Sequence, residues 1–353
     1  MRYTLFGKTG LRVSELCLGT MTFGEDWGWG APRETSARVL DRFAGAGGNF
    51  VDTANNYTDG TSESMLGELL AKRRDRFVLS TKFTSMTRPG DLNSAGNHRK
   101  NLMSSLEDSL RRLRTDYIDV LWVHARDTFT PVAEVMRALD DQVRAGKVRY
   151  VGVSDWFAWE IAQAVTMAEL RGWTPFAGVQ MRYNLLGRTA ERELLPMARG
   201  LDLAVLAWGP LAEGALTGKY LRSAPDGRLN RVAGWNSAGE PTGAAVREVV
   251  AVAEECGGSP AAVALAWLRA RPGVVIPVIG TTKESQLADN LSSLELDLTG
   301  EHLARLDKVS APSLGFPHEF LRHPAITEVV YGDRWQDIED RRSTTRRAVN
   351  DET

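Results

Sequence analysis

The sequence predicts an α/β fold, a closed (β/α)8 barrel of the TIM type, and two observations support this. Short segments that are apolar on both faces recur along the chain, and amphipathic segments of helical spacing separate them. This alternation is typical of a parallel sheet whose strands are joined through helices. Because such units fill most of the 353 residues, we favour a closed barrel over the alternative, a doubly wound open sheet.

A β-hairpin is expected first, over residues 3–14, with a Gly-Lys-Thr-Gly turn. The barrel strands are then expected at residues 16–18, 50–51, 77–81, 117–123, 148–153, 176–179, 203–206 and 274–279. The expected helices cover residues 35–46, 62–72, 102–113, 131–145, 159–170, 191–199, 244–255, 260–271, 284–294 and 300–309. No linker divides these elements, so we expect one domain over residues 1–336. Residues 310–336 would be its C-terminal extension, and residues 337–353 a charged, flexible tail.

The composition indicates a globular protein, with 43% hydrophobic and 25% charged residues. The net charge of −2 gives no reason to expect a nucleic-acid partner. Two cysteines cannot build a disulfide framework, and the first residues lack the apolar core of a signal peptide. No segment approaches the roughly 18 apolar residues that span a bilayer. We expect a cytoplasmic protein without a membrane partner, assign no metal ligands, and leave the oligomeric state open.

Polar side chains occur at the carboxyl ends of the predicted strands, which meet at one opening of a barrel. Asp52 ends the second strand and Tyr57 follows five residues later, whereas Lys82 and His124 end the third and fourth strands. Singly, each has an ordinary explanation, as a cap, a packing residue, a solvated charge or a hydrogen-bonded histidine. Their joint occurrence at successive strand ends favours a shared catalytic site.

These four residues are the parts of a proton donor. An isolated phenol has a pKa near ~10 and protonates a carbonyl oxygen poorly at neutral pH. The Lys82 ammonium is expected to lower the pKa of Tyr57, and Asp52 would keep that ammonium charged. His124 could donate a hydrogen bond to the same carbonyl oxygen. The predicted reaction is hydride transfer to an aldehyde or ketone, with the hydride supplied by a cofactor.

Several motifs resemble those of the aldo-keto reductases. They are Val51-Asp52-Thr53-Ala54 with Tyr57, Thr81-Lys82-Phe83, residues 109–120 leading to His124, Leu18-Gly19-Thr20-Met21, Gly152-Val153-Ser154, residues 180–185 and residues 208–212. The resemblance covers residues 2–308 and implies a (β/α)8 barrel that binds an extended nicotinamide dinucleotide at its opening. It also implies a catalytic tetrad of Asp52, Tyr57, Lys82 and His124.

The resemblance further implies which residues would hold the cofactor. Ser154 and Gln180 would hold the nicotinamide carboxamide, and Trp208 would stack on its ring. The other implied contacts are Gly19, Thr20, Met21 and Asp52 at the opening, Gly209, Pro210, Leu211, Gly214, Leu216 and Lys219 along the pyrophosphate, and Gly280, Thr282, Lys283, Gln286 and Asn290 at the adenosine end.

The cofactor expected is NADPH or NADP, with NADH possible. Many family members place an arginine against the 2′-phosphate of the cofactor, whereas this chain has Thr281-Thr282-Lys283 there. One lysine with neighbouring hydroxyls can still hold a phosphate.

Four tryptophans would form an aromatic pocket for a small-molecule carbonyl substrate, because they fall in predicted loops at the opening: Trp27, Trp29, Trp156 and Trp235. Such a pocket suits an aryl or alkyl aldehyde and equally the apolar face of a sugar. The expected function is the reversible NAD(P)H-dependent reduction of aldehydes or ketones. The alternatives are a keto-sugar reductase, including one for nucleotide sugars, and a cofactor-binding regulatory subunit like the potassium-channel β-subunits.

Overall fold

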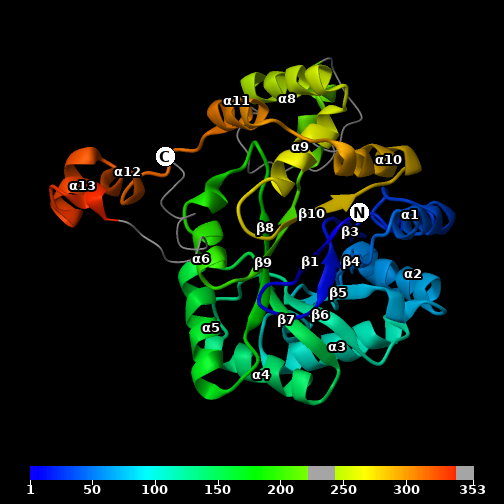
Figure 1. Cartoon of the computed structure of the whole chain (residues 1–353). Helices are drawn as coiled ribbons and strands as arrows, with labels where there is room; N and C mark the ends of the chain where they lie inside the picture. The colour runs from blue at the N-terminus through cyan, green and yellow to red at the C-terminus, as the bar shows by residue number, and fades with distance from the viewer. Residues whose placement is uncertain (222–242, 339–353) are drawn as a thin grey trace.

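The computed structural model describes residues 1–221 and 243–338, and Figure 1 shows how their helices and strands are arranged. Within these residues, eight parallel strands close into a barrel in the order β10-β3-β4-β5-β6-β7-β8-β9, which confirms the expected fold. Strands β1 and β2 pair antiparallel as the expected hairpin. Trp235 and most of the charged tail, beyond residue 338, lie outside the described residues.

The strands are short and follow the expected positions closely. Their bounds are β1 Tyr3–Leu5, β2 Arg12–Ser14, β3 Cys17–Gly19, β4 Phe50–Asp52, β5 Val78–Phe83, β6 Ile118–Val123, β7 Val148–Ser154, β8 Phe176–Arg182, β9 Ala204–Trp208 and β10 Val275–Gly280. The helices are α1 Arg33–Gly45, α2 Thr61–Leu70, α3 Arg99–Leu113, α4 Val132–Arg144, α5 Ala158–Arg171, α6 Leu194–Gly200, α8 Gly243–Cys256, α9 Pro260–Arg269, α10 Glu284–Ser292, α11 Gly300–Ser310, α12 His318–Leu321 and α13 Pro324–Tyr331.

Side chains alternate between the inside and the outside of the barrel, as the pleat of a strand requires. On β5, Val78 lies in the interior cluster, whereas Leu79 and Phe83 pack in the outer layer with the helices. Ser80 and Lys82 share the inward face of Val78, because they are two and four residues further along the strand. Polar residues that end a strand on this face therefore meet at the carboxyl opening of the barrel.

Phe6, which follows β1, closes the opposite end of the barrel. Its side chain is fully buried and meets the rings of Phe50 and Trp122 edge-on, at 5.8 and 6.0 Å between ring centroids. Gly7 has a φ of 57°, and a Cβ there would lie 2.4 Å from the Ala177 carbonyl oxygen. A glycine is therefore required for the hairpin to approach the barrel this closely.

The helices form an outer layer whose apolar faces cover the strands. α4 buries Val135, Met136 and Leu139 on one face. α9 packs against α8, α10 and β10, and its residues from Ala261 to Leu268 are all buried, so it needs no polar face. No single helix in the described part of the chain is long and apolar enough to cross a membrane. Taken together, α8 and α9 have the length and apolar composition of a membrane span, but the chain bends by 96° between them.

The helix expected at residues 191–199 begins later than predicted. A short 3-10 turn covers Thr189–Glu191, and α6 begins at Leu194. Pro196 explains the shift, because proline lacks an amide proton and is tolerated only in the first turn of a helix. The helical pattern therefore continues across a break that the apolar spacing does not reveal.

The C-terminal extension contrasts with the barrel, because none of the described residues 311–338 is buried. Figure 1 shows α12 and α13, in orange and red, set apart from the barrel. The extension contacts the rest of the chain through Phe316, whose carbonyl oxygen accepts from the Arg192 side chain at 2.9 Å. His318 Nε2 also lies 3.3 Å from the carboxylate of Glu193.

Replacing Phe6 with Ala is expected to destabilise the protein by about 3–5 kcal/mol, because a buried ring is lost and a cavity remains. The measurement is the midpoint of urea unfolding, followed by far-UV circular dichroism. Leu5→Ala is the control, since the Leu5 side chain is 50% exposed. Equal shifts for the two variants would contradict the role given to Phe6.

Candidate active site

The site lies where β4, β5 and β6 end. The register pairs Asp52 with Ser80, so Lys82 lies one layer closer to the opening on the same inward face. Lys82 pairs in turn with Trp122, and His124 follows two residues later. These strand ends bring the expected residues Asp52, Lys82 and His124 together, with Tyr57 in the loop after β4.

Lys82 is fully buried, and all three protons of its ammonium have acceptors. Nζ donates to Asp52 Oδ2 at 2.5 Å, to the Thr53 carbonyl oxygen at 2.7 Å and to Tyr57 Oη at 3.0 Å. Burial alone would lower the pKa of Lys82, but the neighbouring Asp52 carboxylate outweighs it, so the pKa lies above its usual value. Lys82 therefore stays charged, and one of its protons points at the phenol.

Ser80 was not predicted from the sequence, yet it completes the ion pair. Its hydroxyl donates to Asp52 Oδ1 at 2.6 Å, while Lys82 occupies Oδ2. Both carboxylate oxygens are thus satisfied inside the barrel, as a buried charge requires. The signal was present in the sequence, because Ser80 lies two residues before Lys82 and so shares its face.

A left-handed turn carries Tyr57 back over Lys82. Tyr57 begins a short 3-10 segment, Tyr57–Gly60, and the next three residues have φ values of 46°, 55° and 94°. Thr58 holds this turn in place, because its hydroxyl donates to the Phe23 carbonyl oxygen at 2.7 Å and accepts from the Ser62 amide at 3.1 Å. Two non-glycine residues in the left-handed region mark a backbone that its surroundings must enforce.

The pKa of Tyr57 moves in the opposite direction to that expected. Burial raises the pKa of the phenol, and the ammonium of Lys82, which acts to lower it, only partly offsets the effect. Tyr57 therefore keeps its proton at neutral pH. Because its oxygen accepts from Lys82, the phenol can donate that proton to a substrate.

His124 lies beside the phenol. The two rings are 5.9 Å apart between centroids and meet edge-on at 80°, and the ring nitrogen Nδ1 lies 3.3 Å from Ser85 Oγ. Burial, with the nearby charge of Lys82, lowers the pKa of His124 to about 3. The imidazole is therefore neutral, with one nitrogen able to donate a hydrogen bond and the other able to accept one.

Ser154 and Gln180 lie side by side, because the register pairs them at the ends of β7 and β8. Both are buried, and Gln180 Nε2 has no hydrogen-bond partner among the described residues. A buried amide donor without a partner is unusual in a folded protein. A carboxamide oxygen of nicotinamide would supply the missing acceptor, so this pair fits the group that the resemblance assigns to it.

Trp208 ends β9 and is only partly buried. Its Nε1 donates to Asp155 Oδ1 at 3.1 Å, and the Arg182 guanidinium lies 5.9 Å from the centroid of its rings. These two contacts fix the orientation of the indole at the opening, on the strand next to Gln180. A fixed aromatic ring here is suited to stacking on a flat cofactor ring.

The segment expected along the pyrophosphate has an unusual backbone. Ala212, Glu213 and Gly214 have consecutive φ values of 47°, 54° and 90°. A Cβ on Gly214 would lie 2.7 Å from Lys219 Nζ, so that ammonium closely approaches the backbone. Backbone amides in such conformations can form anion-binding concavities, which suits a pyrophosphate.

The adenosine end is expected at the start of α10, after β10. Gln286 Oε1 accepts from Thr281 Oγ1 at 3.0 Å, from the Thr282 amide at 3.1 Å and from Thr282 Oγ1 at 3.4 Å. Lys283 is exposed beside this cluster, whereas Asn290 is buried on α10. Gln286 therefore organises the loop, and the exposed ammonium offers a charge to a phosphate.

The tryptophans expected in the substrate pocket differ in how far they are buried. Trp27 and Trp29 form a tilted pair with 5.6 Å between ring centroids, and Trp27 Nε1 donates to Asp59 Oδ1 at 3.2 Å. Both are partly exposed in the loop after β3, close to the Tyr57 turn. They remain candidates for the substrate side.

Trp156 corrects the expectation, because its side chain is only 3% exposed. Its ring meets Phe176 edge-on at 6.1 Å and lies under the Arg126 guanidinium at 4.9 Å. Asp155, which precedes it, has a φ of 52°, so the chain turns sharply at this point. Trp156 therefore packs in the layer between strands and helices.

No group of three or more potential metal ligands occurs within residues 1–221 and 243–338.

The His124 imidazole is expected to stay neutral between pH 5 and 8, since burial places its pKa near 3 instead of at the usual value of about 6.5. The measurement is the pH dependence of its ring signals in nitrogen–proton correlation spectra, assigned with a His124→Gln variant. A titration midpoint between pH 6 and 7 would contradict the environment described for the ring.

The chain is similar to known proteins over most of its length. The family model described as the aldo/keto reductase family matches residues 15–311. The norsolorinic acid reductase stcV of Emericella nidulans is 40% identical over 322 residues, which are 88% of this chain and 82% of that protein. The uncharacterized oxidoreductase YrpG of Bacillus subtilis is 39% identical over 319 residues, 88% of this chain and 96% of that protein.

The putative aryl-alcohol dehydrogenase AAD14 of Saccharomyces cerevisiae is 35% identical over 344 residues, 93% of this chain and 92% of that protein. The match to the family model covers most of the chain and includes Asp52, Tyr57, Lys82 and His124. The chain therefore belongs to the aldo/keto reductase family of oxidoreductases.

Proposed function

We propose that this protein reduces aldehydes or ketones with a nicotinamide cofactor, preferably NADPH, and that Tyr57 supplies the proton. The observation that carries the proposal is the saturated ammonium of Lys82, which donates to Asp52, to Thr53 and to the Tyr57 oxygen. This arrangement leaves a neutral phenol whose proton is free for a substrate and whose anion would be stabilised as it forms.

The side chains divide the work between them. Tyr57 would protonate the carbonyl oxygen, and the charge left on its oxygen would face the Lys82 ammonium at 3.0 Å. His124, neutral, would donate a hydrogen bond to the same carbonyl oxygen and orient it. When bound, the nicotinamide would supply the hydride. Ser154 and Gln180 would hold its carboxamide, and Trp208 would lie against its ring.

The proposed substrates are aromatic carbonyl compounds. The tilted pair Trp27 and Trp29 offers apolar ring surface near the Tyr57 turn, and aromatic rings pack well on such surfaces. Relatives named norsolorinic acid reductase and aryl-alcohol dehydrogenase support this choice. A panel of aryl aldehydes, alkyl aldehydes and keto-sugars, followed at the NADPH absorbance band, separates this proposal from a keto-sugar reductase. Turnover with none of them would favour a regulatory subunit.

Replacing Tyr57 with Phe is expected to lower kcat by at least about 100-fold, because the variant keeps the ring and loses the proton. Reduction of an aromatic aldehyde, followed by loss of NADPH absorbance, measures this effect. Quenching of tryptophan fluorescence by NADPH should survive, since the phenol is not proposed to hold the cofactor. Unchanged turnover in this variant would remove Tyr57 as the proton donor.

Lys283→Ala is expected to raise KM for NADPH by about fivefold, because an exposed ion pair contributes about 1 kcal/mol. The KM for NADH should change little, since NADH has no 2′-phosphate. Lys100→Ala, which removes an exposed charge from α3, is the matched control. An equal effect on both cofactors would assign Lys283 a role other than recognition of the 2′-phosphate.

A further inference from the structure

We propose that Asn97, acting together with Thr84, is a positioning residue for His124. The proposal rests on the catalytic role given to His124 above and extends it to a loop that the sequence did not single out. Asn97 lies just before α3, far from His124 in the sequence, and its side chain is fully buried. Its side chain is hydrogen-bonded to the Ala125 carbonyl oxygen and to the Thr84 hydroxyl, which accepts from the His124 amide.

The first contact fixes the amide of His124. That amide donates to the Phe83 carbonyl oxygen at 3.0 Å and to Thr84 Oγ1 at 3.2 Å. The Thr84 hydroxyl then donates its own proton to Asn97 Oδ1 at 2.6 Å. The orientation of the Thr84 hydroxyl is thus set by Asn97, and the His124 amide is held through it.

The second contact fixes the residue that follows His124. Asn97 Nδ2 donates to the Ala125 carbonyl oxygen at 2.9 Å, and the Asn97 backbone amide donates to Asp127 Oδ2 at 2.9 Å. One short side chain therefore contacts Ala125 directly and the His124 amide through Thr84. Asparagine is suited to this because it combines an acceptor and a donor on one planar group.

The backbone around these contacts is itself constrained. Thr84 has a φ of 113°, a conformation that non-glycine residues rarely adopt. The Gly96 amide donates to the Thr84 carbonyl oxygen at 2.8 Å, and the Gly96 carbonyl accepts from Asn101 Nδ2 at 2.8 Å. Asp127, which accepts from the Asn97 amide, also accepts from Thr130 Oγ1 at 2.5 Å. The hydrogen bonds of Asn97 with Thr84, Ala125 and Asp127 are called the Asn97 bracket below.

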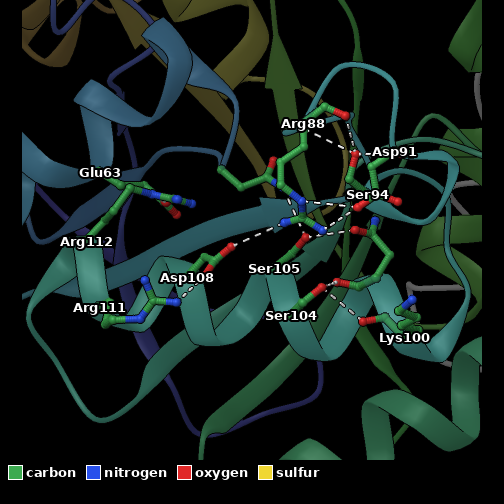
Figure 2. A network of polar contacts seen from close by, with 12 residues as sticks. Glu63, Arg88, Asp91, Ser94, Lys100, Ser104, Ser105, Asp108, Arg111 and Arg112 are labelled. Carbon is green, nitrogen blue, oxygen red and sulfur yellow. Dashed lines mark hydrogen bonds and ion pairs between the residues drawn. The ribbon is translucent and has the colours of Figure 1, made fainter.

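The rest of the loop is fastened to α3. Figure 2 shows Arg88 between Asp91 and Asp108, with Ser94 close by. Arg88 donates to Asp91 Oδ2 at 2.9 Å and lies 3.9 Å from Asp108 Oδ2. The Ser94 hydroxyl donates to the Arg88 carbonyl oxygen at 2.8 Å. Arg88 thus links the start of the loop to α3 by an exposed ion pair, and Asn97 contacts Ala125 and Asp127 at its end.

The consequence for the reaction is geometric. The His124 ring must reach the carbonyl oxygen that Tyr57 protonates, and a displacement of about 1 Å can cost about 100-fold in rate. The segment of Thr84 and Ser85 contacts both the backbone and the ring of His124. Ser85 Oγ lies 3.3 Å from the ring nitrogen Nδ1. Loss of the Asn97 bracket should therefore lower kcat and leave the binding of the cofactor unchanged.

The test compares Thr84→Val with Thr84→Ser, because valine keeps the shape of threonine without its hydroxyl and serine keeps the hydroxyl. Thr84→Val and Asn97→Ala are expected to lower kcat by at least about tenfold with little change in KM, whereas Thr84→Ser retains most of the activity. Asn93→Ala, an exposed asparagine in the same loop, is the matched control and should have no effect. Fluorescence quenching by NADPH confirms that each variant is folded.

A double-mutant cycle and the His124 ring signals separate positioning from general damage. In a His124→Ala background, Asn97→Ala should lower kcat no further, because its effect passes through the histidine. The His124 signals should move in Asn97→Ala and stay unchanged in Asn93→Ala. Additive losses, or unmoved signals with kcat within about twofold of the native value, would overturn the proposal. Full activity of His124→Ala alone would instead overturn the catalytic role of the histidine.

Discussion

The site depends on one interaction, the buried ion pair between Asp52 and Lys82. An ammonium in the interior of a barrel is costly unless each of its protons has an acceptor, and Lys82 meets this condition with Asp52, Thr53 and Tyr57. Ser80 satisfies the second carboxylate oxygen. Removing one partner would leave an uncompensated charge and destabilise the protein by about 3–5 kcal/mol. The pair is thus both a structural element of the barrel and the source of the field at the phenol.

Burial sets the protonation states of the groups beside this pair. Its two charges balance, so a further charge nearby would be poorly solvated. Tyr57 and His124 accordingly remain neutral, with the pKa of the phenol raised and that of the imidazole lowered by burial. On the proposed function, a neutral phenol beside a permanent cation would hold its proton until a carbonyl oxygen arrives, and its anion would be stabilised once the proton has left.

The sequence predicted the parts that follow from the alternation of strand residues. Asp52, Lys82 and His124 end consecutive strands on the inward face, so their meeting follows from the barrel alone. Three features required the structure. Asn97 reaches His124 through a folded loop, Trp156 turns away behind Asp155, and the pKa of Tyr57 rises because the extent of burial is not written in the local sequence. Each depends on contacts between segments that no periodicity relates.

One hydrogen bond links the Tyr57 turn to the tryptophan pair. Asp59, in the left-handed part of that turn, accepts the indole proton of Trp27, the residue proposed to meet the substrate. A substrate ring that shifts Trp27 would therefore act on the backbone that aims the phenol. The β5 side is held by other residues, because the buried Asn97 side chain is bonded to Thr84 and Ala125. On the proposed function, a substrate held against Trp27 would therefore act on the Tyr57 turn, whereas the backbone at His124 would be held by the separate contact of Asn97 with Ala125.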